Sequence, residues 1–168
     1  MLTIRTATRD DLPAVAAIYA HYVTETVVTF DENPPALDAW HDRHADLSTR
    51  GLPFLIAEAD GEVAGYAYAT PWRPKPAYRH TVEDSIYLSP AWSGRGFGSA
   101  LLQAVLDACT DAGLHQVIAV IVDPGSDASA ALHRKHGFIE VGRLQSVGHK
   151  HNRWLDTVLM QRTLRDRR

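Results

Sequence analysis

The sequence predicts a mixed α/β (α+β) domain, in which helices flank a central and mostly antiparallel sheet. Alternating and helical hydrophobic patterns follow one another in the order β-α-α-β-β-β-α-β-α-β-β. The middle of this order consists of hairpins, and only the later part alternates strand and helix, which favours a mixed sheet over an all-parallel one. A length of 168 residues suits one domain, which we assign to residues 1–168.

The first third of the chain predicts one strand and two helices. Residues 2–6 alternate between apolar and polar side chains as a short strand. Residues 8–11 (Thr-Arg-Asp-Asp) resemble a capping box with Asp in place of Glu, and apolar residues then recur at helical spacing over residues 12–22. A second helix is expected at residues 36–49, after the Pro34-Pro35 break.

The rest of the chain predicts a hairpin, a glycine turn, and alternating strands and helices. Asp60-Gly61 is a strong hairpin signal and joins strands at residues 53–59 and 62–70. A proline-rich loop at residues 71–76 precedes a strand at residues 81–88. Further along, a helix is expected at residues 99–112, a strand at 116–122, a helix at 128–136, and strands at 138–147 and 154–164.

Composition and charge predict a soluble, cytoplasmic protein. The formal charge of −3 is close to neutral, so bulk electrostatics recruit neither nucleic acid nor a membrane surface. The N-terminus lacks a signal-peptide pattern, and no apolar run reaches the roughly 18 residues of a membrane span. Cys109 is the only cysteine, which excludes an internal disulfide, and its apolar neighbours predict a buried side chain. The Arg-rich end, residues 162–168, is expected to be a solvated tail.

A glycine-rich turn at residues 93–98, Ser-Gly-Arg-Gly-Phe-Gly, lies between a predicted strand and a predicted helix. Successive N–H groups and the helix N-terminus make such a turn a pocket for an anion such as a pyrophosphate. A plain strand-to-helix turn is the alternative, since glycine is common wherever φ must be positive. The turn is not a P-loop, because no Lys-Ser/Thr pair follows its last glycine. It is not the turn of a dinucleotide-binding fold either, because it does not follow the first strand.

Residues 82–102, which contain this turn, resemble the acetyl-CoA signature of the GNAT acetyltransferase superfamily. The whole chain is similar, more narrowly, to phosphinothricin N-acetyltransferases and related acetyltransferases of small amino acids. The matching motifs run in the family's order: Pro71-Trp72-Arg73, Thr81-Val82-Glu83 with Ser85-Ile86-Tyr87, Leu132-His133 with Gly137-Phe138, and residues 148–156. The resemblance implies an N-acetyltransferase that moves the acetyl group of acetyl-CoA to a small-molecule amine.

The resemblance also implies where acetyl-CoA binds. Its pantetheine arm is expected along the strand Ile86-Tyr87-Leu88, with the N–H of Leu88 facing the thioester oxygen. The residues expected to complete the cofactor site are Gly94, Arg95, Gly96, Phe97, Gly98, Ser99, Ser126, Ser129 and His133. Two positions depart from the family, since Ser93 replaces Gln or Arg and Ser126 replaces Asn. These changes either weaken cofactor binding or are compensated by Arg95.

Acetyl transfer to an amine needs a proton acceptor, because amino groups titrate near ~8 or above and are mostly cationic at pH 7. Glu83 stands three residues before Ile86 and matches the glutamate assigned as general base in the resembled family, acting directly or through water. A surface carboxylate is the alternative. His133 and Tyr87 are the two candidates for the acid that protonates the departing thiolate. The structural alternative for His133 is a histidine stabilised by the end of its helix, and for Tyr87 it is aromatic packing within a strand.

A small amino acid also presents a carboxylate, which a guanidinium fork matches best. Arg73, Lys75 and Arg79 cluster just before Glu83, although three cations so close together also occur on an ordinary solvated face. By the resemblance, the acceptor site is lined by Arg73, Pro74, Lys75, Tyr78, Glu83, Asp84 and Ser85, with Phe30 as a wall of the pocket or as a core residue.

No metal is expected, because His149 and His151 share a strand face but lack a third ligand at a sensible spacing. In the similar family, the segment that ends at Trp154 lies near the acceptor site and the dimer contacts, which implies a homodimer.

Two rival functions stay open. One is acetylation of a peptide N-terminus or a lysine, for which the cations of residues 72–75 are less suited. The other is a non-catalytic acyl-CoA-binding module, against which Glu83 argues.

Overall fold

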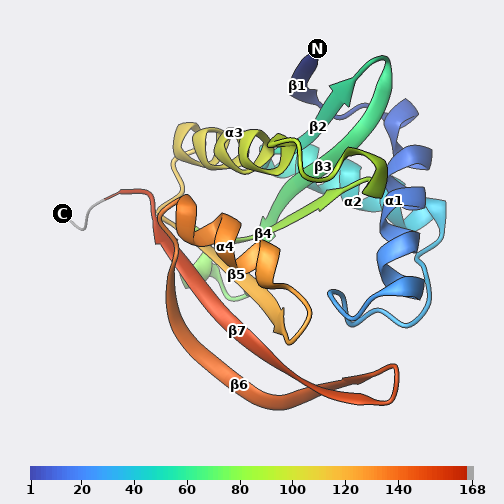
Figure 1. Ribbon diagram of the computed structural model, residues 1–168. Helices are drawn as coiled ribbons and strands as arrows, with labels where there is room; N and C mark the ends of the chain where they lie inside the picture. Colours follow the sequence, from blue (N-terminus) through green and yellow to red (C-terminus); the bar gives the residue numbers. More distant parts are fainter. Residues whose placement is uncertain (166–168) are drawn as a thin grey trace.

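The computed structural model describes residues 1–165, which form one seven-stranded sheet with helices on both faces (Figure 1). The strands are β1 (Leu2–Thr6), β2 (Phe54–Ala59), β3 (Glu62–Pro71), β4 (Thr81–Leu88), β5 (Gln116–Asp123), β6 (Ile139–Lys150) and β7 (Arg153–Thr163). The helices are α1 (Leu12–Glu25), α2 (Leu37–Arg50), α3 (Phe97–Asp111) and α4 (Asp127–Lys135). Across the sheet the order is β1-β2-β3-β4-β5-β7-β6, and every neighbouring pair is antiparallel except β4 with β5. The mixed, mostly antiparallel sheet expected from the sequence is confirmed.

The elements follow one another in the predicted order, and most of their ends lie within two residues of the prediction. The strand β6 is an exception, because it continues to Lys150 and not to residue 147. A two-residue turn, His151-Asn152, joins β6 to β7 with φ angles of 50° and 59°. Such turns are usually recognised from an Asn-Gly or Asp-Gly pair, so this turn left no signal in the sequence.

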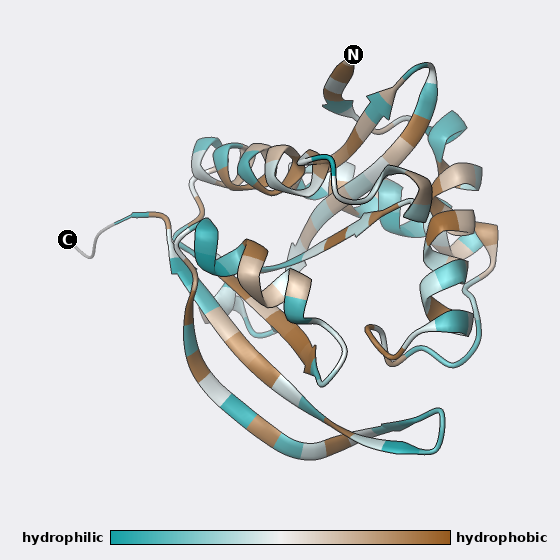
Figure 2. Cartoon of the chain, viewed as in Figure 1, coloured by the Kyte–Doolittle hydropathy of each residue, from teal (hydrophilic) through white to brown (hydrophobic). Residues whose placement is uncertain are grey.

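The side chains of the central strands alternate between two hydrophobic cores, because successive residues of a strand point to opposite faces. On β2 and β3, the side chains that pack against α1 and α2 are Phe54, Ile56, Tyr66 and Tyr68. Their neighbours on the other face, mostly alanines, pack against α3, and α4 lies on that same face. Figure 2 shows the result as hydrophobic bands along the central strands.

The parallel contact between β4 and β5 is short. It holds only the pairs Thr81↔Gln116, Val82↔Val117 and Glu83↔Ile118. Beyond Glu83 the two strands part, although each stays paired with its other neighbour, β3 or β7. The sheet therefore contains a split between the second halves of β4 and β5 (Figure 1).

The segment between α1 and α2 reaches across this split to the far strands. Val27 packs with side chains of β5 and β7, and the Lys150 ammonium donates to the Thr29 carbonyl at 2.7 Å. The Phe30 ring lies against β6 and leaves no room for a Cβ at Gly148. These contacts connect the first half of the sheet to the second on the side of α1.

The structure confirms the sequence prediction for Cys109 and corrects part of the prediction for the Arg-rich end. Cys109 is fully buried, as predicted, and burial raises the pKa of its thiol to about 12. The prediction of a solvated tail is wrong for Arg162, which lies in β7 and donates to the His136 carbonyl. Arg165 is exposed, as predicted, and donates to the Thr110 carbonyl at 2.5 Å. Residues 166–168 of this tail lie outside the described residues.

Gly65→Ala tests the close approach of β3 and β4 beside the split. Gly65 lies opposite Leu88, and an added Cβ would stand 2.6 Å from Leu88 Cδ2 and 2.9 Å from the Tyr87 carbonyl oxygen. We expect the free energy of unfolding, measured by denaturant titration, to fall by about 1–3 kcal/mol, the usual cost of overpacking a core. Gly142→Ala is the matched control, since a Cβ there finds its nearest atom at 4.0 Å. Equal stability of the two variants would contradict the close approach.

Candidate active site

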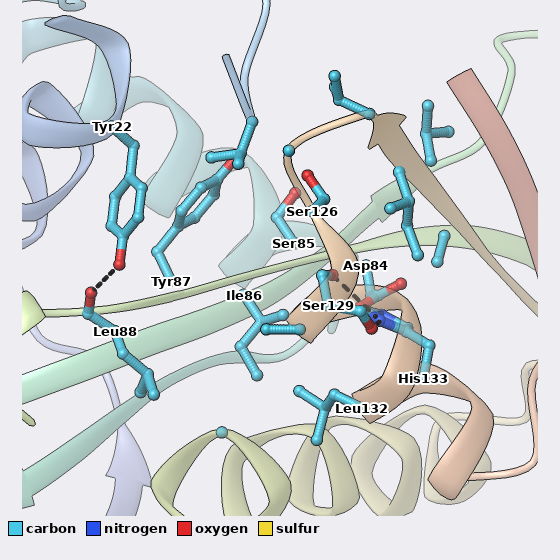
Figure 3. A pocket seen from close by; sticks show the side chains of 18 of the residues that line it. Tyr22, Asp84, Ser85, Ile86, Tyr87, Leu88, Ser126, Ser129, Leu132 and His133 are labelled. Carbon is cyan, nitrogen blue, oxygen red and sulfur yellow. Dashed lines mark hydrogen bonds and ion pairs between the residues drawn. The ribbon is translucent and has the colours of Figure 1, made fainter. Parts of the chain in front are cut away.

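A cavity of about 540 Å³ occupies the split between β4 and β5 (Figure 3). Its walls come from β4, β5, α4 and the glycine turn, and α1 contributes Tyr22. Among the residues singled out from the sequence, those that line the cavity are Glu83, Asp84, Ser85, Ile86, Tyr87, Leu88, Gly94, Gly98, Ser126, Ser129 and His133. Most of the predicted cofactor positions therefore surround one cavity.

The split leaves one edge of β4 without a neighbouring strand. The N–H of Ser89, just after β4, bonds to the Ala64 carbonyl of β3. Every second residue back from Ser89 therefore directs its backbone groups at β3, as antiparallel pairing requires. The residues between them, Asp84, Ile86 and Leu88, direct their N–H and C=O groups into the split. Such an edge suits an extended amide-containing arm like pantetheine, which can bond to it as an added strand does.

One of these carbonyls already has a partner. The Tyr22 hydroxyl of α1 donates to the Leu88 carbonyl at 2.5 Å (Figure 3), and burial raises the pKa of Tyr22. Tyr22 fitted the helical spacing of the first helix, so sequence reasoning assigned it only a packing role. In the structure it also anchors the end of β4 at which the Leu88 N–H faces the cavity.

The glycine turn and the start of α3 close one end of the cavity. Gly94 and Gly96 have left-handed φ angles of 76° and 80°, with open space where a Cβ would stand. This lets the chain enter α3 with its first N–H groups unpaired by the helix. Ser93 donates to a carbonyl of its own loop at 3.0 Å. The predicted cofactor residues of the turn and of α3 that do not line the cavity are Arg95, Gly96, Phe97 and Ser99.

His133 of α4 and Asp84 of β4 form a buried pair across the split (Figure 3). His133 Nε2 lies 2.8 Å from Asp84 Oδ2, and the two side chains are 3% and 2% exposed. His133 Nδ1 lies 2.7 Å from the Ser129 carbonyl oxygen, which only accepts hydrogen bonds. Nδ1 therefore carries a proton, and a second proton lies between Nε2 and the carboxylate. Neither ring nitrogen is left for another partner.

The surroundings of this pair favour a charged His133. Burial lowers the pKa of His133, but the hydrogen bond and charge of Asp84, together with the Ser129 carbonyl, outweigh burial and raise it. An imidazolium beside a carboxylate gives a partner to both ring nitrogens of His133 and to Oδ2 of Asp84. Asp84 Oδ1 has no hydrogen-bond partner among residues 1–165. To the two interpretations drawn from the sequence, helix-end histidine and catalytic acid, the structure adds a brace between α4 and β4.

Glu83 and Tyr87 lie on the other face of β4, toward α1 and α2, because side chains alternate along a strand. Burial and the neighbouring Asp84 raise the pKa of Glu83, although Arg73 and Arg43 oppose the shift. A carboxylate with a raised pKa is a better proton acceptor near neutral pH. Tyr87 packs edge-on among other tyrosines, and burial raises its pKa as well. Sequence reasoning missed Arg43, which reaches this face from α2.

The predicted acceptor residues do not all meet at this cavity. Those that line it are Glu83, Asp84 and Ser85, whereas those that line a second cavity of about 730 Å³ are Arg73, Pro74 and Lys75. Tyr78 and Phe30 line neither cavity. The Arg73 guanidinium stacks on the Trp72 ring at 4.8 Å, yet its charge lowers the pKa of Glu83. The loop after β3 therefore acts on the cavity in the split through charge.

Within residues 1–165, no three His, Cys, Asp or Glu side chains group closely enough to hold a metal ion. His149, one of the two histidines noted in the sequence, packs against Trp154, with the two rings tilted by 53° and their centroids 4.6 Å apart. In the same part of the chain, no helix is both long and apolar enough to cross a bilayer.

The cavity combines a strand edge without a neighbouring strand, a glycine turn and a carboxylate of raised pKa. The model of the acetyltransferase (GNAT) family matches residues 15–138. This range includes β4, the glycine turn and α4. The chain belongs to the acetyltransferase (GNAT) family. The enzyme class expected from the sequence, an acyltransferase that depends on acetyl-CoA, is confirmed.

Two relatives agree with the narrower resemblance. The chain is 48% identical over 162 residues to a phosphinothricin N-acetyltransferase of Alcaligenes faecalis, which covers 96% of this chain and 82% of that protein. It is 42% identical over 166 residues to an L-methionine sulfoximine/L-methionine sulfone acetyltransferase of Pseudomonas paraeruginosa, covering 96% of this chain and 94% of that protein. The resemblance to phosphinothricin acetyltransferases is therefore confirmed.

Two solved structures share the fold. The Salmonella typhimurium protein yncA, solved with its cofactor acetyl-CoA, has a TM-score of 0.97 at 34% identity, covering 100% of this chain and 96% of that one. A ribosomal-protein-alanine N-acetyltransferase of Brucella melitensis has a TM-score of 0.92 at 39% identity, covering 96% of this chain and 99% of that one. Only the second of these names states an acceptor, so a shared fold does not by itself identify the acceptor of this chain.

Asp84→Asn tests the brace between α4 and β4. The carboxylate raises the pKa of His133, so we expect the NMR titration midpoint of that ring to fall in the variant. A raised pKa stabilises the fold fully below the unfolded value of about 6.5, and this contribution is lost as pH rises through the folded value. At about pH 6 we expect the free energy of unfolding to fall by roughly 1–3 kcal/mol, with a smaller loss at higher pH. Asp111→Asn, on the exposed end of α3, is the control, and an unchanged His133 titration would contradict the brace.

Proposed function

We propose that the enzyme transfers the acetyl group of acetyl-CoA to the α-amine of a small amino acid or amino-acid analogue. The observation that carries the proposal is the split in the sheet. There β4 offers a free backbone edge to the donor, and Glu83 lies on the face from which an amine can approach. The names of the two relatives, for phosphinothricin and for methionine sulfoximine or sulfone, support an acceptor of this kind.

The donor-binding residues that we assign follow from the same split. Backbone groups of Ile86 and Leu88 bond the pantetheine arm, and the glycine turn holds the pyrophosphate through N–H groups at the start of α3. The Leu88 N–H faces the thioester oxygen and stabilises the negative charge that develops there. Ser126 and Ser129, at the start of α4, complete the wall of the cavity. The N–H donors of this cavity suit both the amides and the phosphates of acetyl-CoA.

Glu83 accepts a proton from the amine, directly or through water, so that a neutral amine attacks the thioester carbonyl. The C–N bond forms, the C–S bond breaks, and the departing thiolate takes up a proton. Tyr87 and His133 are the candidates for this acid. Both ring nitrogens of His133 are engaged, so it can donate to the thiolate only if its bond to Asp84 or its bond to Ser129 opens.

A second function, acetylation of a peptide or protein, is favoured by one neighbour, since the Brucella melitensis protein is named a ribosomal-protein-alanine N-acetyltransferase. A thiol-release assay with acetyl-CoA distinguishes the functions. Its acceptors are free amino acids, phosphinothricin, methionine sulfoximine and sulfone, an alanine-ended peptide and a lysine peptide. Release with free amino acids or their analogues supports our proposal, whereas release with peptides alone contradicts it. Binding of acetyl-CoA without release for any acceptor would indicate a non-catalytic module.

We also propose a homodimer, as the resemblance implies. The strand β6 lies at the edge of the sheet, and the exposed apolar side chains of β6 and β7 are Ile139, Val141, Leu144, Val147 and Trp154. An unpaired edge with apolar side chains is a common site of association. Light scattering measures the mass of the protein in solution and so tests the homodimer.

The cytoplasmic location, the single domain of residues 1–168 and the lack of nucleic-acid or membrane partners stay predictions from the sequence.

Glu83→Gln is expected to lower turnover by roughly 10²–10⁴-fold, the usual contribution of a positioned base, with an unchanged Kd for acetyl-CoA. The loss shrinks at high pH, because more of the substrate amine is then already neutral. Steady-state kinetics across pH, together with calorimetric binding, measure both effects. Glu62→Gln, an exposed glutamate at the start of β3, is the matched control. A wild-type rate for Glu83→Gln at pH 7 would show that another group takes the proton.

Arg73→Ala tests whether the loop after β3 recognises the acceptor carboxylate. The KM for an amino-acid acceptor is expected to rise roughly 10- to 150-fold, the value of a charge-assisted hydrogen bond. The KM for acetyl-CoA is expected to stay the same. An acceptor amine without a carboxylate is the control, for which the substitution matters little. Equal effects on both amines would show that Arg73 acts through the fold or through its charge on Glu83 and not on the carboxylate, and an effect on acetyl-CoA alone would assign the loop to the cofactor.

A further inference from the structure

A chain of four side chains connects the start of α3 to the end of α4. Gln103 Nε2 donates to Asp107 at 2.9 Å, and Gln103 Oε1 lies 3.2 Å from His136 Nδ1. His136 Nε2 lies 2.8 Å from Ser99 Oγ. Ser99 is a predicted cofactor residue, and it follows Gly98, which lines the cavity. His136 was not singled out from the sequence.

The partners fix the direction of every hydrogen bond in this chain. A carboxylate only accepts, so Gln103 turns its amide N–H to Asp107 and its carbonyl oxygen to His136. His136 Nδ1 must then carry a proton, and Nε2 of the neutral ring can only accept. The Ser99 hydroxyl therefore donates to His136, which leaves only lone pairs on its oxygen for another partner.

That direction is unfavourable beside an anion. Phosphate oxygens only accept, so a hydroxyl that contacts a phosphate must donate its hydrogen bond. A proton on His136 Nε2 reverses the last bond of the chain, because the ring then donates to Ser99 Oγ. The Ser99 hydroxyl is thereby free to donate to the anion, and an imidazolium charge stands behind it.

We propose that His136 takes up a proton when acetyl-CoA binds, and that this proton turns Ser99 into a donor to the pyrophosphate. His136 is then a positioning residue of the cofactor site, which acts through Ser99. The inference rests on the function proposed above, in which the glycine turn and Ser99 hold the pyrophosphate.

The groups around His136 keep its ring neutral until an anion arrives. Burial lowers the pKa of His136, and the charges of Lys135, Arg162 and His133 lower it further. Lys135 and His133 belong to α4, and Arg162 reaches the ring from β7, where it donates to the His136 carbonyl. On the side of α3 the ring faces the neutral side chains of Ser99 and Gln103. The Asp107 carboxylate lies at the far end of this series of hydrogen bonds. The negative charges of a pyrophosphate oppose the three cations and raise the pKa.

Thermodynamic linkage gives the sign of the effect. A pKa that binding raises makes binding stronger as pH falls. The gain is complete below the pKa of His136 in the free enzyme, which lies under its ordinary value of 6.5. It is lost as pH rises through the pKa in the complex. Between these two values the affinity changes by up to about tenfold per pH unit, with uptake of up to about one proton per ligand.

The probe must not titrate in the same range. The 3′-phosphate of acetyl-CoA is a monoester with a pKa near ~6, so the probe is dephospho-CoA, which keeps the pyrophosphate and lacks that group. Calorimetry of the full chain in two buffers of different ionisation enthalpy, at equal pH and ionic strength, counts the protons taken up. We expect net uptake for the wild type near pH 7 and none for His136→Gln, whose amide donates to Ser99 without a proton. His41→Gln, which removes a histidine of α2 bonded to Arg9, is the matched control and should behave as wild type.

Ser99→Ala provides a second measurement on a folded variant. It should weaken binding more at about pH 6 than at about pH 8, because the hydroxyl donates to the ligand only when His136 is protonated. Equal proton uptake by the wild type and His136→Gln, or an equal loss for Ser99→Ala at both pH values, overturns this inference and leaves the proposed function intact. If neither acetyl-CoA nor dephospho-CoA binds at any pH, the proposed function fails and this inference fails with it.

Discussion

The parting of β4 and β5 after Glu83 is the constraint on which the rest of the site depends. A strand edge inside a sheet leaves N–H and C=O groups without strand partners, and such groups cost free energy unless something else bonds them. Tyr22 takes the Leu88 carbonyl, and the other groups face the cavity. In the function that we propose, a donor with amides along its length supplies the missing partners. The molecule that the enzyme binds would then also stabilise the unpaired edge.

A split sheet can bind a ligand in a defined position only if its two halves keep a fixed separation. Contacts on both faces of the sheet keep the two halves in place. On the face of α3 and α4, Asp84 meets His133. On the face of α1, Lys150 reaches the Thr29 carbonyl. Asp84 and the adjacent Glu83 point to opposite faces because side chains alternate along β4. The brace and the proposed base are therefore adjacent in sequence and lie on opposite faces of the same strand.

Local patterns predicted the order of the elements and the glycine turn, because periodicity and turn residues are properties of a few adjacent positions. Roles that depend on distant partners were not predicted. Tyr22 meets Leu88 across 66 residues of sequence, and His136 meets Ser99 across 37. The pattern around Asp84 did not predict that its carboxylate would bond to a histidine 49 residues away. A pattern within one strand or helix carries no information on which residue of another element it will face.

His133 and His136 end the same helix, yet their surroundings shift their pKa values in opposite directions. His133 has the Asp84 carboxylate as a partner, and its pKa is raised despite burial. His136 has burial and three cations around it, and its pKa is lowered. The end of a helix favours cations in general, so the carboxylate makes the difference. In the free enzyme the helix therefore ends with one charged and one neutral histidine. If His136 takes up a proton as we propose, an anion at the glycine turn changes the charge of the second histidine, while Asp84 keeps the proton on the first.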